Sequence, residues 1–408
     1  MKTRYLFVML VVLSIGLMQG CKKDEEQIVP VYLVNSSQYT SANHLYTVDD
    51  IKGYIEQNGQ SNVVSLATHD IKLYKLKYKT ALEGDTITAS GLLAVPVPAD
   101  KKEAFPLMSF QHEVITAYAD APSTNPEGDL TAMATYMAST GMIVMIPDYI
   151  GFGSTTDEFH PFMNKQYSAG AVVDFIKAVK EFIAIEKPCK TNGKLFLSGY
   201  SEGGSVTLAA LDAIENDAAN IDLTVTAATC GAGIYDLNKF RSWMMTQTKY
   251  DEPYYMAYML KSFSTYSGVD NDYSLVFNTV YADEIPNMFD GVKSGSQIND
   301  MIGTLHVGEL YNDDFESDSI YNADEKYAGL REAFTENSIN AWSLKSDVTF
   351  YYGKNDTWVP GEQALLAYSN FKNQGSSAQI KIEQLDGLDN PGAAIPTLSK
   401  SVIKFLSY

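Results

Sequence analysis

Cysteine, histidine and positive charge are all scarce in this sequence. The 408 residues include 3 cysteines and 5 histidines, and 30 lysines and arginines stand against 50 aspartates and glutamates, for a formal net charge of −20. This charge argues against nucleic acid or an anionic membrane surface as a partner. The hydrophobic share of 45% nevertheless suffices for a large buried core, which excludes an intrinsically disordered chain.

The cysteines are too few and too dispersed for a disulfide framework. Cys189 precedes one predicted strand, and Cys230 lies at the far end of the next strand along the chain. Opposite ends of neighbouring parallel strands are too distant for a disulfide bond. Without histidine ligands nearby, these cysteines also do not form a zinc site. We therefore expect two free thiols, with neither a metal nor another cofactor.

The pattern of residues at the N-terminus predicts an export signal. Lys2 and Arg4 precede a short apolar run that is too short and too closely followed by charge to span a membrane, so residues 1–20 are predicted to be a signal peptide. The run ends in "LMQGC", which resembles a lipobox with Cys21 as the lipidated residue, and the following "KKDEE" resembles the export tag of Bacteroidetes surface lipoproteins. These features predict an outer-membrane lipoprotein of the cell envelope, held by its lipid anchor only. A soluble secreted protein with a chance cysteine is the alternative.

Strand and helix patterns alternate through most of the chain. Residues 71–97 read as an antiparallel hairpin, after which short apolar runs alternate with helical spacing, as in buried parallel strands with crossover helices. We predict an α/β fold with a mostly parallel, doubly wound sheet. The expected organisation is a linker and lead-in over 21–60, a core over 61–234 and 343–408, and an inserted helical cap over 235–342.

The stretch "GKLFLSGYSEGGS" places a G-x-S-x-G motif between a predicted strand and a predicted helix. This is the context that a nucleophile elbow requires, with Ser201 as the nucleophile. Gly199 and Gly203 have a steric reason to be glycine, because side chains there would clash with the flanking strand and helix. A purely structural turn is the alternative interpretation.

A candidate acid follows a later strand. In "FYYGKNDTWVP", Asp356 lies just beyond a predicted strand end, where a carboxylate would orient an imidazole and stabilise its charged form.

Together with "IPDYIGFGST", the "HPF" at His160 and "ENSINAW", these motifs resemble the secretory lipase branch of the α/β-hydrolase superfamily, from about residue 70 to the C-terminus. The resemblance implies an α/β-hydrolase fold and a serine esterase or lipase that works through an acyl-enzyme on a small-molecule ester or lipid-like ligand. We expect a monomer.

The resemblance also implies a catalytic histidine after the last strand, within a D-H-x-G-A-A-I-P pattern. Here the sequence is "LDNPGAAIP", so Asn390 occupies that position, and no histidine follows Asp356. An amide cannot accept the serine proton. His112, His160 and His306 are the possible substitutes, of which His112 is the best placed in the chain.

A second departure lies in the loop that would help form the oxyanion hole. The resemblance implies Q-H-G-T, whereas this chain has "QHEV". Backbone N–H groups of the loop at His112 and Glu113, together with that of Glu202, would still be the donors. However, an ionised Glu113 pointing inward would oppose the developing negative charge.

One helical face of the predicted cap carries Tyr255, Met256, Met259, Leu260 and Phe263. Its first interpretation is packing against the core, and its second is an acyl-chain pocket. Two functions therefore remain open. One is a serine carboxylic-ester hydrolase, and the other is a catalytically weak or inactive hydrolase-fold lipoprotein that binds a small ligand.

Overall fold

The computed structural model describes residues 29–38, 45–57 and 63–408. The predicted signal peptide and Cys21 lie outside the described residues, so export and lipidation stay predictions. None of the helices in the described ranges is long and apolar enough to cross a membrane.

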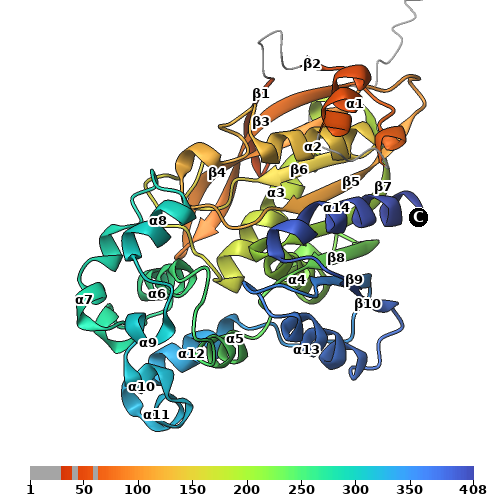
Figure 1. Cartoon of the computed structure of the whole chain (residues 1–408). Helices are drawn as coiled ribbons and strands as arrows, with labels where there is room; N and C mark the ends of the chain where they lie inside the picture. Colours follow the sequence, from red (N-terminus) through yellow and green to blue (C-terminus); the bar gives the residue numbers. More distant parts are fainter. Residues whose placement is uncertain (1–28, 39–44, 58–62) are drawn as a thin grey trace, which may run out of the picture.

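A single twisted sheet of ten strands runs through the described part of the chain (Figure 1). Its order is β1-β3-β4-β6-β5-β7-β8-β9-β10, with β2 paired to β3. The first part of this order is antiparallel, and all pairs from β6 to β10 are parallel. The strands are β1 (Leu33–Gln38), β2 (Leu45–Tyr46), β3 (Ile71–Leu82), β4 (Asp85–Pro96), β5 (Ala104–Gln111), β6 (Ile143–Pro147), β7 (Lys190–Tyr200), β8 (Ala227–Gly231), β9 (Asp347–Gly353) and β10 (Ile380–Leu385).

The predicted hairpin is formed by β3 and β4, which pair over their whole length. Its tight turn has positive φ angles at Glu83 (51°) and Gly84 (89°), as a two-residue hairpin turn requires. By contrast, every residue of β6 is buried, because helices cover both faces of the sheet there.

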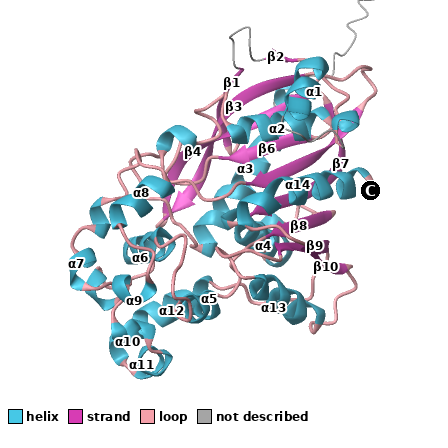
Figure 2. Ribbon diagram, viewed as in Figure 1, coloured by secondary structure: helices cyan, strands magenta, loops and turns pink. Residues whose placement is uncertain are grey.

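Helices cover both faces of the sheet and make three layers (Figure 2). The two faces have separate apolar clusters, each shared between strands and the helices above them. One face is covered by α3 (Lys165–Glu186), α4 (Glu202–Asn216) and α13 (Gly361–Lys372), and the other by α1 (Val48–Gln57), α2 (Asp129–Ser139) and α14 (Asn390–Leu406).

The segment expected as a linker and lead-in contributes to this core. Strand β1 pairs with β3 at the sheet edge, and Ile51 and Ile55 of α1 are buried against the sheet. The Glu181 carboxylate on α3 accepts hydrogen bonds from the backbone N–H groups of residues 31–33. The edge strand is therefore held by a side chain that is distant in sequence, which no local pattern shows.

Between β8 and β9, over the predicted cap, the chain forms helices around an apolar cluster of their own. These are α5 (Leu237–Met244), α6 (Tyr254–Tyr266), α7 (Thr279–Ala282), α8 (Gly295–Ile302), α9 (Val307–Leu310), α10 (Asp313–Glu316), α11 (Asp318–Ala323) and α12 (Ala328–Asn337).

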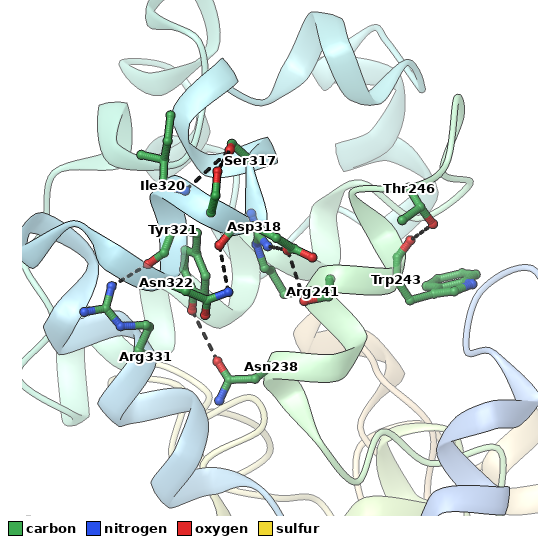
Figure 3. Close-up of polar contacts among 12 residues, drawn as sticks. Asn238, Arg241, Trp243, Thr246, Ser317, Asp318, Ile320, Tyr321, Asn322 and Arg331 are labelled. Carbon is green, nitrogen blue, oxygen red and sulfur yellow. Dashed lines mark hydrogen bonds and ion pairs between the residues drawn. The ribbon is translucent and has the colours of Figure 1, made fainter.

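A fully buried arginine links α5 to α11 within this segment (Figure 3). Arg241 on α5 forms an ion pair with Asp318 at the start of α11. Its guanidinium carbon also lies 4.2 Å from the centre of the Tyr321 ring and 4.8 Å from that of Phe315. Charge pairing and cation–π contact offset part of the cost of burying this side chain, whose Nε and Nη2 have no hydrogen-bond partner within the described residues.

Cys189 and Cys230 are both free and buried, as the sequence predicted. Burial raises the pKa of the Cys189 thiol to about 11 and that of Cys230 further still. Neither thiol is therefore ionised at neutral pH, which makes both unreactive.

Candidate active site

Ser201 lies in a strained turn between β7 and α4. Its backbone has φ 55° and ψ −121°, which a residue with a side chain adopts only when the surrounding structure enforces it. The Ser201 N–H donates to the Gly231 carbonyl at 2.9 Å, and the Ser201 carbonyl accepts from the Gly204 N–H at 2.9 Å. These bonds hold the serine at the carboxyl end of the parallel strands.

Two glycines of the motif are required by close backbone approach. A Cβ atom on Gly199 would lie 2.1 Å from the Gly203 carbonyl oxygen, and one on Gly203 would lie 1.9 Å from the carbonyl oxygen of Gln111. Both distances are far shorter than a van der Waals contact. The second contact also brings the loop after β5, which carries His112 and Glu113, against the start of α4.

Asp356 follows β9 and is held by three donors. Its Oδ1 accepts hydrogen bonds from the N–H groups of Trp358 (2.9 Å) and Val359 (2.8 Å). Its Oδ2 accepts from Asn390 Nδ2 at 2.8 Å. The carboxylate is thus fixed with one oxygen turned toward the residue at the predicted base position.

Asn390 is the first residue of α14 and is buried. Its backbone carbonyl accepts a hydrogen bond from the Tyr200 hydroxyl at 2.5 Å, and Asp389 caps the helix by accepting from the Gly392 N–H. The structure therefore brings Ser201, Asp356 and Asn390 together at one end of the sheet, with an amide where an imidazole would be needed.

Ser201 and Asn390 both line one cavity of about 630 Å³. Its lining includes apolar residues of α1, α2 and α14, such as Ile55, Met133 and Leu398, and also Asp129 at the start of α2. The lining also contains Glu113, Glu252 and the aromatic residues Tyr254, Tyr255 and Trp358. A cavity of this size accommodates a small organic ligand.

Comparison with solved structures decides the fold. The chain is similar to a proposed hydrolase of Legionella pneumophila (24% identity over 92% of this chain and 98% of the other, TM-score 0.80). It is also similar to the rice cell wall degrading esterase LipA of Xanthomonas oryzae (23% identity, 92% and 97%, TM-score 0.77). The chain has the α/β-hydrolase fold. The predicted fold class is therefore confirmed.

Two further comparisons are consistent with this hydrolase fold. Candida antarctica lipase A in its closed state is 16% identical over 91% of this chain and 82% of that chain, with a TM-score of 0.62. The family model of the prolyl oligopeptidase family matches residues 129–285, which include the elbow. The chain matches no curated protein in sequence.

Within the hydrolase fold, no histidine lines the described cavity. The His112 ring packs on Tyr149, with centroids 4.2 Å apart, and its Nδ1 lies 2.6 Å from the Glu113 carbonyl oxygen. Burial lowers the His112 pKa to about 4, so this imidazole is neutral. His306 precedes α9 in the insertion, where its backbone forms an isolated antiparallel β-bridge with Lys249. The cavity that contains Ser201 therefore receives no imidazole from either residue.

His160 contacts Glu202, the residue that follows Ser201. Its Nε2 lies 2.8 Å from Glu202 Oε1, its Nδ1 lies 2.8 Å from the carbonyl oxygen of Ile150, and both side chains are almost fully buried. Glu202 is the first residue of α4, so its N–H is among the backbone donors that a helix start leaves unpaired. The His160–Glu202 pair thus fixes the residue that the sequence predicted as an oxyanion donor.

Glu113 lines the cavity. It stands in the predicted oxyanion loop, at the position where the resemblance implies a glycine. Burial, with the nearby charges of Asp129 and Glu202, raises the pKa of this carboxyl. The protonated form is thereby favoured relative to an exposed glutamate, which reduces its repulsion of an oxyanion.

Sequence reasoning missed two roles in the insertion. The Tyr255 hydroxyl contacts the Ser201 side chain, and Glu252 lines the same cavity with a pKa that burial raises to about 7. The sequence singled out Tyr255 only as part of an apolar face. Met256, Met259, Leu260 and Phe263 of that face are buried in the insertion's own cluster, so they pack there and not in the sheet clusters against which the sequence placed them.

Burial also raises the pKa of Asp356, to about 6, from a usual value near 3.8. The folded state thus retains a proton that the unfolded chain releases between about pH 4 and 6, so stability falls as pH rises through this window. We expect Asp356→Asn to stabilise the fold by about 1–2 kcal/mol at pH 8 and to have little effect at pH 4. The new amide oxygen can keep the two backbone bonds, and Asn390 can rotate its amide to accept. Denaturant unfolding at the two pH values measures the change in the free energy of unfolding. An equal change at both pH values would contradict the role of the Asp356 charge.

Proposed function

We propose that this chain is a serine hydrolase that cleaves a small carboxylic ester through an acyl-enzyme on Ser201, at a rate limited by the missing base. The observation that carries the proposal is the strained backbone of Ser201 at the wall of the cavity. Strained backbone of this kind clusters at active sites, where the surrounding structure enforces it. The fold shared with known esterases and a lipase supports the same reaction class.

In this reaction the Ser201 hydroxyl attacks the ester carbonyl, and the oxyanion accepts hydrogen bonds from the N–H of Glu202 and of the loop at 112–113. Collapse of this intermediate expels the alcohol, and water then releases the acid. Asn390 can hold Asp356 but cannot accept the serine proton, which must pass to water. Loss of one triad member leaves on the order of 10³- to 10⁴-fold catalysis over water, so turnover should be slow.

A fluorophosphonate probe tests this proposal, because it phosphonylates a serine only where the oxyanion site and nucleophile are aligned. We expect slow stoichiometric labelling of the wild-type protein and none of Ser201→Ala. Mass spectrometry of the labelled peptide identifies the serine. Labelling at another residue, or equal labelling of both proteins, would exclude Ser201 as the nucleophile.

The second candidate function is ligand binding without turnover. The bond from Asn390 Nδ2 to Asp356 Oδ2 favours it, because it gives the buried carboxylate a stable neutral partner in place of a base. An unlabelled Ser201 in a folded protein that still binds an ester would support this alternative.

A further inference from the structure

The cavity at Ser201 has an unbalanced charge. Three acidic residues, Glu113, Asp129 and Glu252, are among the residues that line it, whereas lysine and arginine are absent from this lining. Within the described ranges, no ion pair joins any of the three to a basic side chain. The described part of the cavity therefore contains three acidic groups without an ion-pair partner.

The chain stabilises these carboxyls mainly by neutral contacts. Glu252 Oε2 accepts a hydrogen bond from Asn299 Nδ2 at 3.0 Å, and the Asn299 Oδ1 accepts from the Tyr254 N–H at 3.2 Å. Burial raises the pKa of both Glu113 and Glu252, and neighbouring acids, Asp129 for Glu113 and Asp251 for Glu252, raise it further. A positive group entering the cavity would lower these pKa values, because it favours the charged form of each carboxyl.

Aromatic rings line the cavity together with these carboxyl groups. Tyr254 and Tyr255 meet edge to face with centroids 4.8 Å apart, and Tyr200 and Trp358 line the same space. The faces of tyrosine and tryptophan rings attract cations, including quaternary ammonium groups, and this attraction grows when water is excluded. Carboxyl groups, aromatic rings and apolar side chains of α1, α2 and α14 therefore line one and the same cavity.

From this arrangement we infer that the cavity binds a cationic amphiphile, in which a compact ammonium group is joined to an apolar chain. The ammonium group lies near Glu252 and the rings of Tyr254, Tyr255 and Trp358, and the apolar chain lies along α2 and α14. For the proposed esterase, on which this substrate assignment rests, the substrate is then an ester that carries an ammonium group. The binding preference itself requires no turnover.

Two ligands of the same shape test the charge directly. Butyrylcholine carries a trimethylammonium group, and 3,3-dimethylbutyl butyrate has a neutral carbon in place of its nitrogen. Binding is measured by calorimetry to the Ser201→Ala protein at pH 8, where Glu252, with its pKa of about 7, is mostly ionised. We expect butyrylcholine to bind about tenfold more tightly, or better, because the cation gains contacts that the carbon lacks.

Single substitutions then locate the preference. Glu252→Gln keeps an oxygen that can accept from Asn299 but removes the charge, and we expect it to lower the preference several-fold. Asp129→Asn, at the exposed start of α2, should lower it less. Glu362→Gln is the matched control, because Glu362 is exposed on α13 and does not line the cavity. Thermal melting of each variant shows whether it is folded.

The outcomes separate this inference from the proposed function. Equal affinity for the two ligands, no detectable binding of butyrylcholine, or a preference unchanged in both Glu252→Gln and Asp129→Asn would overturn the inference. Fluorophosphonate labelling of Ser201 without a charge preference would leave the hydrolase standing and the cationic ligand excluded. A charge preference without labelling would support the cationic site on a protein that binds and does not hydrolyse.

Discussion

Asn390→His is expected to raise the hydrolysis of a short-chain nitrophenyl ester by about 10²-fold or more, the usual scale of general-base catalysis. Asn390 Nδ2 already donates to Asp356 Oδ2 at 2.8 Å, so an imidazole at this position would direct Nδ1–H to the same oxygen. Asp356 would then hold the tautomer that leaves Nε2 free to accept the Ser201 proton and would stabilise the imidazolium. Initial rates of purified protein measure the gain.

Two controls make this result specific to the restored base. Adding Ser201→Ala to Asn390→His should abolish the gain, and adding Asp356→Asn should remove most of it. Because Glu113 lines the cavity beside the predicted oxyanion donors, pairing Asn390→His with Glu113→Gly should increase the gain further. If neither variant is faster than wild type while circular dichroism shows both folded, then Asn390 is not the vacant base position.

Gly203→Ala is expected to destabilise the fold by about 3 kcal/mol, at the upper end of the cost of overpacking. The added Cβ would lie 1.9 Å from the Gln111 carbonyl oxygen and 2.5 Å from its carbon, both of which are backbone atoms that cannot rotate away. The start of α4 would have to move off β5, and the elbow with it. Denaturant unfolding gives the loss of stability, and fluorophosphonate labelling reports the displaced serine.

Gly170→Ala is the matched control for this substitution. Gly170 lies inside α3, and a Cβ there would meet nothing within 4 Å. Because alanine is favoured over glycine in a helix interior, this variant should be more stable by about 0.5–1 kcal/mol. A Gly203→Ala protein as stable as wild type would show that the two backbone segments are not held together as described.

The hairpin, the alternation of strands and helices, and the elbow could all be predicted from the sequence because each depends on neighbours in the chain. Alternating polar and apolar residues mark β3, continuous apolar runs mark β5 and β6, and the glycines around Ser201 mark a turn that only they can form. The position of Asn390 followed from resemblance to a motif and not from any physical property of the stretch itself.

Strand β1 could not be predicted, because its pairing depends on the distant Glu181 and on β3. The order of candidate bases could not be predicted either. His112 seemed the best substitute from its position in the chain, yet its ring packs on Tyr149 and does not line the cavity. Side-chain direction depends on what packs against a residue, and a linear pattern does not contain that information.

The sequence by itself determined the hairpin and the parallel strands of the sheet, the turn that holds Ser201 and the absence of a histidine after Asp356, because local propensity and residue identity are properties of the chain. Only the tertiary structure decided what surrounds the serine. It brings Tyr255 of the insertion to Ser201 and Glu252 to the same cavity, and it joins Asn390 to Asp356 across 34 positions. These contacts link segments far apart in sequence, so they exist only after the core has packed and fixed the relative positions of those segments.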